Sequence, residues 1–86
     1  MRINITFKLS DAALICKLAE EDVLFFLEND WLIPHDPINF IFDEADIERI
    51  ILISELKENL GVNNESVPII LHLIDQLNHI HSIVDQ

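Results

Sequence analysis

The segment 44–60 constrains the fold most strongly, because it predicts a helix that is apolar on more than one face. Asp43 is a good capping residue before it, and Gly61, the single glycine, suits the left-handed residue that ends many helices. A helix that is apolar nearly all round is buried between other elements. The chain is therefore expected to pack around the apolar residues of this segment, which are Ile47, Ile50, Ile51, Leu52, Ile53, Leu56 and Leu60.

The N-terminal third predicts a short strand followed by two short helices. Three apolar residues alternate with polar ones between Ile3 and Phe7, which is the period of a half-buried strand. Ser10 suits the cap of a first helix, and the acids at 20–22 favour the start of a second, which should end at 29–30. Two short helices joined by a tight turn are typical of a helix-turn-helix.

Residues 31–42 predict a β-hairpin, which would be the wing of a winged helix. The two ends of this segment, 31–33 and 40–42, are apolar and suit strands, and turn-forming residues lie between them. Trp31 is expected in the core. The two phenylalanines of the second strand share one face and are expected in the core as well.

Residues 67–86 predict a long final helix with Pro68 in its first turn, where the missing N–H costs nothing. The apolar residues of this helix fall on two lines, so one could face the domain and the other a second chain. A heptad seam starts at Val67 and predicts self-association, as a homodimer, through Ile70, Ile74, Leu77, His81 and Val84. Burial of that seam in the domain's own core is the alternative. The second line consists of Ile69, Leu73, Ile80 and Ile83.

Charge separates this chain from DNA-binding helix-turn-helix proteins. Between Lys17 and Arg49 it has ten carboxylates and no Lys or Arg. Affinity for DNA comes largely from cations that neutralise phosphates, so nucleic acid is not expected as a partner. The net charge of -11 also disfavours anionic membranes and favours basic protein surfaces. The chain has 86 residues, 50% of them hydrophobic, and should form a single domain over 1–86 with apolar surface left for a partner.

No residue pattern predicts catalysis, a cofactor or a metal site. Cys16, the only cysteine, cannot form an internal disulfide, which fits a reducing cytoplasm. His72, Asp75 and His79 share one face of the final helix, but a zinc site takes about four convergent ligands. The start lacks the apolar core of a signal peptide, and no apolar run is long enough to span a bilayer. A cytoplasmic protein that is not an enzyme is therefore expected.

The order of these elements resembles the MerR-like winged-helix class, and three segments resemble the bacterial chaperone-modulator family CbpM. Residues 2–7 resemble the opening strand of that family, 40–44 its junction of wing and helix, and 67–81 its long final helix. The matching residues of the final helix include Leu71, Leu73, Asp75, His79 and Ile80. The family has a glycine in the turn near Ala19 that is missing here.

This resemblance implies a mainly α fold and a protein that inhibits a DnaJ-type co-chaperone such as CbpA by binding its J-domain. A J-domain presents a basic helix, which an acidic domain could cover by charge complementarity. The acids expected at this interface are Glu21, Asp22, Glu28, Asp30, Glu44, Asp46 and Glu48. The alternative function is a DNA-binding regulator of the MerR type, which should carry Lys or Arg in the second helix and wing.

Overall fold

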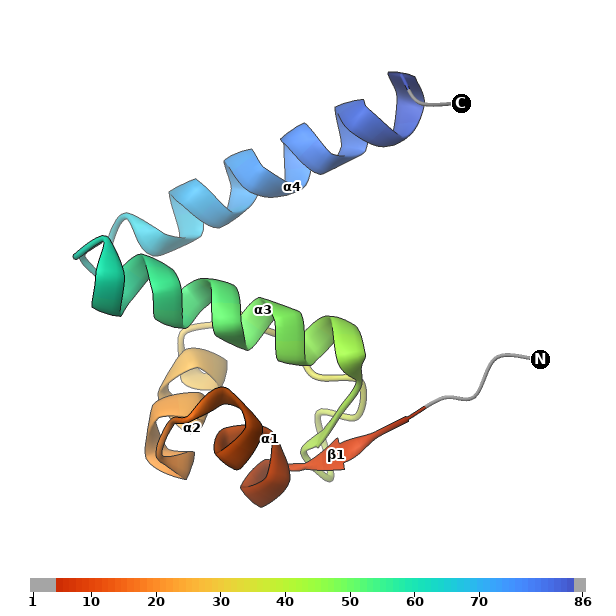
Figure 1. Cartoon of the computed structure of the whole chain (residues 1–86), viewed down its shortest axis with the longest axis vertical. Helices are drawn as coiled ribbons and strands as arrows, with labels where there is room; N and C mark the ends of the chain where they lie inside the picture. The colour runs from red at the N-terminus through yellow and green to blue at the C-terminus, as the bar shows by residue number, and fades with distance from the viewer. Residues whose placement is uncertain (1–4, 85–86) are drawn as a thin grey trace.

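The computed structural model describes residues 5–84 and confirms a mainly α-helical fold (Figure 1). Strand β1 (Phe7–Lys8) leads into helices α1 (Leu9–Cys16) and α2 (Glu20–Glu28). Strand β2 (Ile41–Phe42) precedes helix α3 (Glu44–Ser54), which continues as a π-helical turn, η1 (Glu55–Asn59), and helix α4 (Val67–Val84) completes the chain. Of the expected strand, Ile5 and Thr6 form no strand, and the residues before Ile5 lie outside the described residues.

The turn between α1 and α2 is built without the glycine that such a turn favours. Lys17 has a φ of 60°, in the left-handed region, and its N–H and that of Leu18 donate to the last carbonyl oxygens of α1. This conformation costs a residue with a Cβ about 1–2 kcal/mol. The expected cap is wrong, because α1 starts at Leu9 with Lys8 as its N-cap, and Ser10 lies inside the helix.

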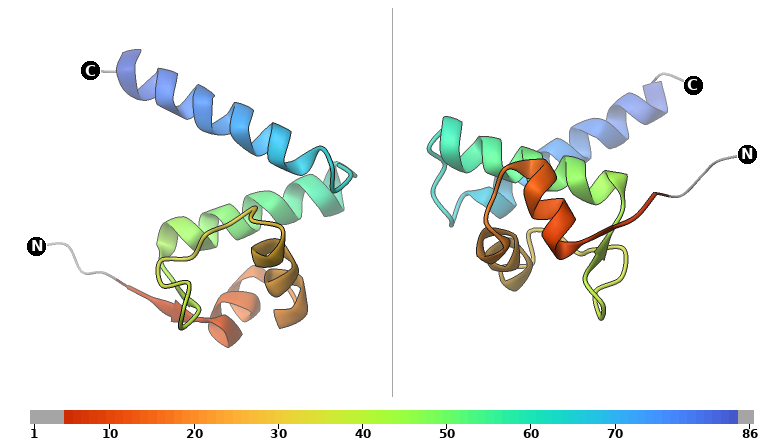
Figure 2. Two further views of the ribbon diagram at one scale, coloured as in Figure 1. Left: turned by 180° about the vertical axis from the view of Figure 1, so that it is seen from behind. Right: turned by 60° about the horizontal axis from the view of Figure 1, so that its bottom comes forward.

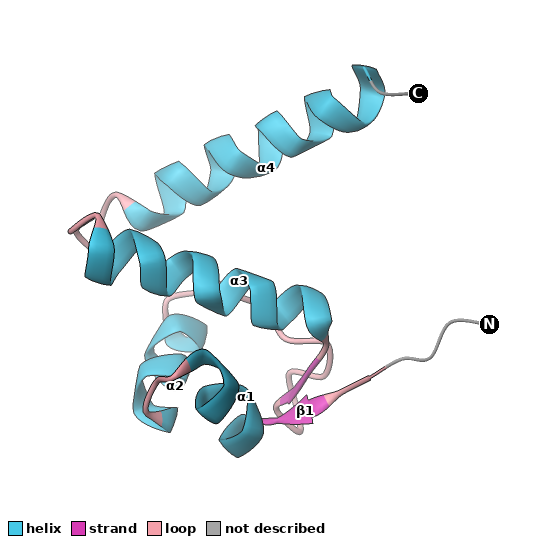
Figure 3. Cartoon of the chain, viewed as in Figure 1, coloured by secondary structure: helices cyan, strands magenta, loops and turns pink. Residues whose placement is uncertain are grey.

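The small sheet differs from the expected hairpin. Strand β2 pairs antiparallel with β1, with Phe42 opposite Phe7, and not with residues 31–33, which form no strand (Figure 3). Trp31 and Leu32 are both buried, each 5% exposed. Successive side chains of a strand point to opposite faces, so an exposed hairpin could not bury both of these neighbours. An irregular segment can bury both side chains, because its side chains need not alternate between two faces. The burial of these two neighbours therefore explains why the predicted strand does not form.

The tip of the expected hairpin does form a closed turn. Asp36 and Ile41 exchange two backbone hydrogen bonds of 2.9 and 3.1 Å. Inside the turn, Asp36 Oδ1 accepts the N–H groups of Ile38 and Asn39 at 3.0 and 3.1 Å. Phe40 has a φ of 53°, an uncommon value for a bulky residue. Its side chain is 40% exposed, so the expectation that it is core is wrong, whereas Phe42 is fully buried as expected.

Helix α3 is the centre of the core, as its sequence predicts. Ile50 and Ile53 are completely buried, and α3 packs against α1 and β2. Asp43 caps the helix, and Gly61, with a φ of 65°, follows its end as expected. The burial is less complete than the sequence indicates, because Ile51 and Leu60 are exposed.

Trp31 lies in the core as expected, at the end of α2. Its ring packs edge-on against Phe25 and tilted against Phe26, with ring centroids 5.6 and 5.8 Å away. Lys57 Nζ lies 5.8 Å from the centre of the Trp31 ring and also donates to the side-chain oxygen of Asn64. The irregular segment after α2 is therefore tied to the end of the central helix.

Helix α4 meets the central helix at the turn 60–66 and diverges from it toward the C-terminus (Figures 1 and 2). Val67 and Leu71 are buried, and Ile70 packs against the core. Asp75 binds Arg49 of α3. Every described side chain from Asp75 onward is exposed, so α4 projects beyond the rest of the domain.

Candidate protein-binding surfaces

The first group of predicted contact residues lies on and just after α2. Glu21, Asp22, Glu28 and Asp30 are all exposed. Asp22 has a second role, because its Oδ2 accepts the N–H of Ala19 at 3.2 Å and so satisfies one free donor at the start of the helix. Asp30 has a φ of 58°, which Asp tolerates better than most residues.

The second group lies at the start of α3, and one of its members is not accessible. Glu44 and Glu48 are exposed, but Asp46 is only 9% exposed. Asp46 Oδ2 accepts the N–H groups of His35 at 2.8 Å and Asp43 at 3.0 Å, and its own N–H donates to Asp43 Oδ1 at 2.8 Å. Asp46 thus fixes the preceding loop onto α3. The expectation that it contacts a partner is wrong for this reason.

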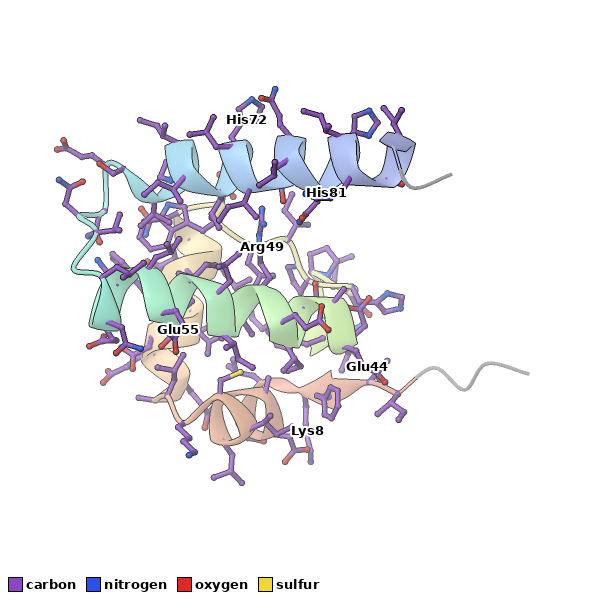
Figure 4. All side chains as sticks on the ribbon, turned by 45° about the horizontal axis from the view of Figure 1, so that its top comes forward. Lys8, Glu44, Arg49, Glu55, His72 and His81 are labelled. Carbon is purple, nitrogen blue, oxygen red and sulfur yellow. The ribbon has the colours of Figure 1, made fainter. Side chains whose placement is uncertain are left out.

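The two groups do not form one patch. In Figures 1 and 2, α2 lies toward the η1 end of α3 and away from the start of α3, and Glu44 marks that start in Figure 4. A compact partner such as a single helix would therefore meet one group at a time. The acids of α2 are the group that lies on the second of the two short helices.

The described Lys and Arg residues all lie outside α2 and the loop that follows it. Lys8 and Lys17 flank α1, Arg49 is bound to Asp75, and Lys57 is bound to Asn64. In Figure 4, Arg49 lies between α3 and α4, and Lys8 lies at the opposite side of the molecule. The second helix and the loop after it carry a negative field that repels phosphate and attracts cationic side chains.

The final helix has its predicted seam divided between the core and solvent. Ile70 and Ile74 are half-buried, and Ile70 packs against the core. Leu77 and His81 are exposed, and the side chain of Val84 lies outside the described residues. The first half of the seam is therefore internal, as one alternative expected. The outward face consists of Ile69, Leu73, Leu77, Ile80 and Ile83, each more than half exposed.

A shallow apolar pocket lies between the end of α2 and the loop that follows it. Leu27, Leu32, Pro34, Pro37 and Phe40 form its walls, and Ile33 and Asp30 complete its lining. Sequence reasoning missed this pocket because it placed residues 31–33 and 40–42 in a hairpin. The two prolines flanking a short polar turn were the available signal for an irregular loop.

The remaining residues of interest are Cys16 and the histidines of α4. Burial raises the pKa of the Cys16 thiol above its usual value, which keeps it protonated and weakly nucleophilic. His72 and His81 point to opposite sides of α4 (Figure 4), and within residues 5–84 no three potential ligands gather to hold a metal ion. In the same part of the chain, no helix combines the length and apolarity needed to cross a bilayer.

Comparison of the sequence with protein-family models and with curated proteins finds no match.

Proposed function

We propose that this chain is a non-catalytic inhibitor that binds the J-domain of a DnaJ- or CbpA-type co-chaperone in the cytoplasm. The observation that carries the proposal is the charge of α2 and the loop after it, where exposed acids stand without any Lys or Arg. A basic helix is the partner that this surface attracts, and the sequence resemblance to chaperone modulators points to the same partner.

The finer fold that accompanies this proposal is a MerR-like winged helix-turn-helix. The pair α1–α2 with its three-residue connection supports it, as does the closed turn 36–41 in the position of a wing. In this arrangement α2 takes the place of a recognition helix. Its acids Glu21, Asp22, Glu28 and Asp30 form the main contact, and Glu44 and Glu48 form a separate second group.

A MerR-type DNA-binding regulator is the competing function, and charge decides between the two. A DNA-binding protein of this class has Lys and Arg on its second helix and wing. These cations contact phosphates and release counterions, which favours binding. This chain places acids there. Like charges at such close range would oppose binding to DNA.

Direct binding of the isolated J-domain from the same cell tests the proposal. We expect a complex at low salt whose affinity falls as salt rises, because exposed charges are screened beyond about 10 Å at 0.1 M and about 3 Å at 1 M. Inhibition of co-chaperone activity should follow the same salt dependence. No binding to any J-domain of that cell, or salt-sensitive binding of the protein alone to DNA, would refute the proposed function.

Self-association through α4 is a second proposal, supported by the exposed apolar face of that helix. Five large apolar side chains there are more than half exposed, which is unusual for a surface that remains in water. The only charged residue between Val67 and Val84 is Asp75, which Arg49 pairs. Two copies could therefore join at this face without the repulsion that their net charge of -11 causes elsewhere.

A further inference from the structure

The pocket beside α2 has the size of one apolar side chain. Its volume is about 180 Å³ and it opens to solvent. A cavity of roughly 150 Å³ holds a benzene ring, whereas sites for drug-sized ligands and cofactors have volumes of about 300–1,000 Å³. The walls of the pocket are apolar apart from Asp30. These dimensions favour a single leucine-, isoleucine- or phenylalanine-sized group over a small-molecule ligand.

Apolar side chains at the rim of the pocket are exposed to solvent and do not pack into the core of the domain. Ile33, which lines the pocket, is 75% exposed, and Ile38 in the adjoining turn is 87% exposed. The loop that carries them is held in place, because Asp46 binds His35 N–H and Asp36 binds the N–H groups of Ile38 and Asn39. A partner would therefore meet a preformed surface and would not have to order it on binding.

One acid lines this apolar surface, and two others are next to its lining residues in the sequence. Asp30 lines the pocket itself, Glu28 follows the lining residue Leu27, and Asp36 precedes the lining residue Pro37. Hydrogen bonds from Asn39 lower the pKa of Asp36, so its carboxylate is charged at neutral pH. Lys57 does not line the pocket. An apolar centre with an acidic rim complements an apolar side chain that is flanked by Lys or Arg.

We propose that the pocket receives an apolar side chain that projects from a Lys- or Arg-rich helix of the partner. This inference rests on the proposed function and places the centre of that interface at the pocket. A second copy of this chain is a poorer occupant, because it would bring another acidic surface to an acidic rim. In this arrangement the apolar side chain supplies affinity, and the acids supply association rate and selectivity.

Titration calorimetry with the isolated J-domain tests the pocket through Ile33→Gln, with Leu14→Gln on α1 as the matched control. The two side chains are 75% and 76% exposed, so both variants should fold alike, which circular dichroism checks. We expect Ile33→Gln to weaken binding about tenfold and Leu14→Gln less than about twofold. The loss for Ile33→Gln should persist at about 1 M salt, whereas the smaller loss for Asp30→Asn should disappear there.

The outcomes separate the pocket from the proposed function. Equal binding by Ile33→Gln and Leu14→Gln overturns the pocket and leaves the proposed function standing. No binding by the unmodified protein overturns both. As an independent measurement, the amide NMR signals of residues 30–40 should shift when the J-domain is added. If those signals shift instead with the concentration of the protein alone, a second copy occupies the pocket and the inference is wrong.

Discussion

Arg49 of α3 and Asp75 of α4 form a bidentate ion pair, with nitrogen–oxygen distances of 2.9 and 2.8 Å. The pair joins the central helix to the helix that projects from the domain (Figure 4). Beyond Asp75 the described part of α4 has only exposed side chains. This contact, together with Val67 and Leu71 closer to the turn, therefore sets how α4 leaves the domain.

The attachment of α4 should weaken in acid. The hydrogen bonds and charge of Arg49 lower the pKa of Asp75 below its usual 3.8. The unfolded chain therefore binds a proton at Asp75 more readily than the folded protein does. As a result the ion pair contributes stability above pH 3.8, and this contribution is lost as the pH falls through the lower pKa that Asp75 has in the folded protein. Asp75 is half exposed, so we expect only about 0.5 kcal/mol at neutral pH.

Urea unfolding of the unmodified protein and of Asp75→Asn measures this contribution. The difference between the two should be constant from neutral pH down to about pH 5 and should shrink below pH 3.8. Glu65→Gln, which removes an exposed acid before α4, is the control and should show no such convergence. A difference that does not change between pH 5 and pH 2 would contradict the expected ion pair.

Removal of the Asp46 carboxylate should destabilise the whole fold. Asp46→Ala loses two accepted hydrogen bonds to backbone N–H groups, from Asp43 and His35, in a nearly buried place. We expect a loss of about 2–3 kcal/mol in the free energy of unfolding, because charged hydrogen bonds and helix capping both contribute. Glu48 is an exposed neighbour, and Glu48→Ala should lower the free energy of unfolding by less than about 0.5 kcal/mol. Similar losses for the two variants would mean that Asp46 is a surface acid.

Much of the helical framework is predictable, because local signals determine it. Asp43 and Gly61 mark the ends of the central helical segment, and the acids at 20–22 mark the start of α2. Asp46 was mistaken for a contact residue although it lies three positions after the capping residue Asp43. That spacing is the pattern of a reciprocal cap, so the sequence did contain the signal for its structural role.

The connection after α2 and the outward face of α4 depend on tertiary contacts that no local pattern encodes. Residues 31–33 look like a strand because they are apolar, but the aromatic contacts of Trp31 with Phe25 and Phe26 bury it in an irregular segment. Likewise, heptad spacing identifies two apolar lines on α4. Which residues face the domain depends on the angle at which Arg49 and the turn 60–66 hold the helix.

Glycine at position 17 should stabilise the protein. Lys17 has a φ of 60°, which costs about 1–2 kcal/mol with a Cβ, while glycine loses roughly 0.5–1 kcal/mol more on ordering its backbone. We expect Lys17→Gly to raise the free energy of unfolding by about 0.5–1 kcal/mol, measured in urea. Lys8→Gly makes the same change at a φ of -83° and should lower stability instead. The same sign for both variants would show that charge, and not backbone strain, controls the result.

The exposed face of α4 should control the oligomeric state. Leu77 is 55% exposed, so Leu77→Asp should convert a dimer to a monomer while the helical circular dichroism spectrum is retained. Leu71, only 3% exposed, is the internal comparison, and Leu71→Asp should unfold the domain because it buries an unpaired charge. Sedimentation velocity distinguishes these results. A monomeric unmodified protein would refute self-association, and unfolding of Leu77→Asp would place Leu77 in the core.

Charge reversal should show which acidic group contacts the proposed partner, a J-domain. One double variant changes α2 and combines Glu21→Lys with Glu28→Lys. A second makes the same change in charge at the start of α3 and combines Glu44→Lys with Glu48→Lys. Each pair includes one acid of the first helical turn. A single reversal such as Glu28→Lys should slow association only modestly, because rim charges act mainly on the rate. The α2 pair should slow association about tenfold or more at low salt and have little effect at about 1 M.

The α3 pair is the matched control for this experiment, because the start of α3 lies away from α2 (Figure 1). It should slow association less than the α2 pair, since only the change in net charge acts over that distance. Stopped-flow fluorescence measures the rates, and circular dichroism checks the fold of each variant. Equal slowing by both pairs would mean that net charge alone steers the partner, and greater slowing by the α3 pair would move the interface to the start of α3.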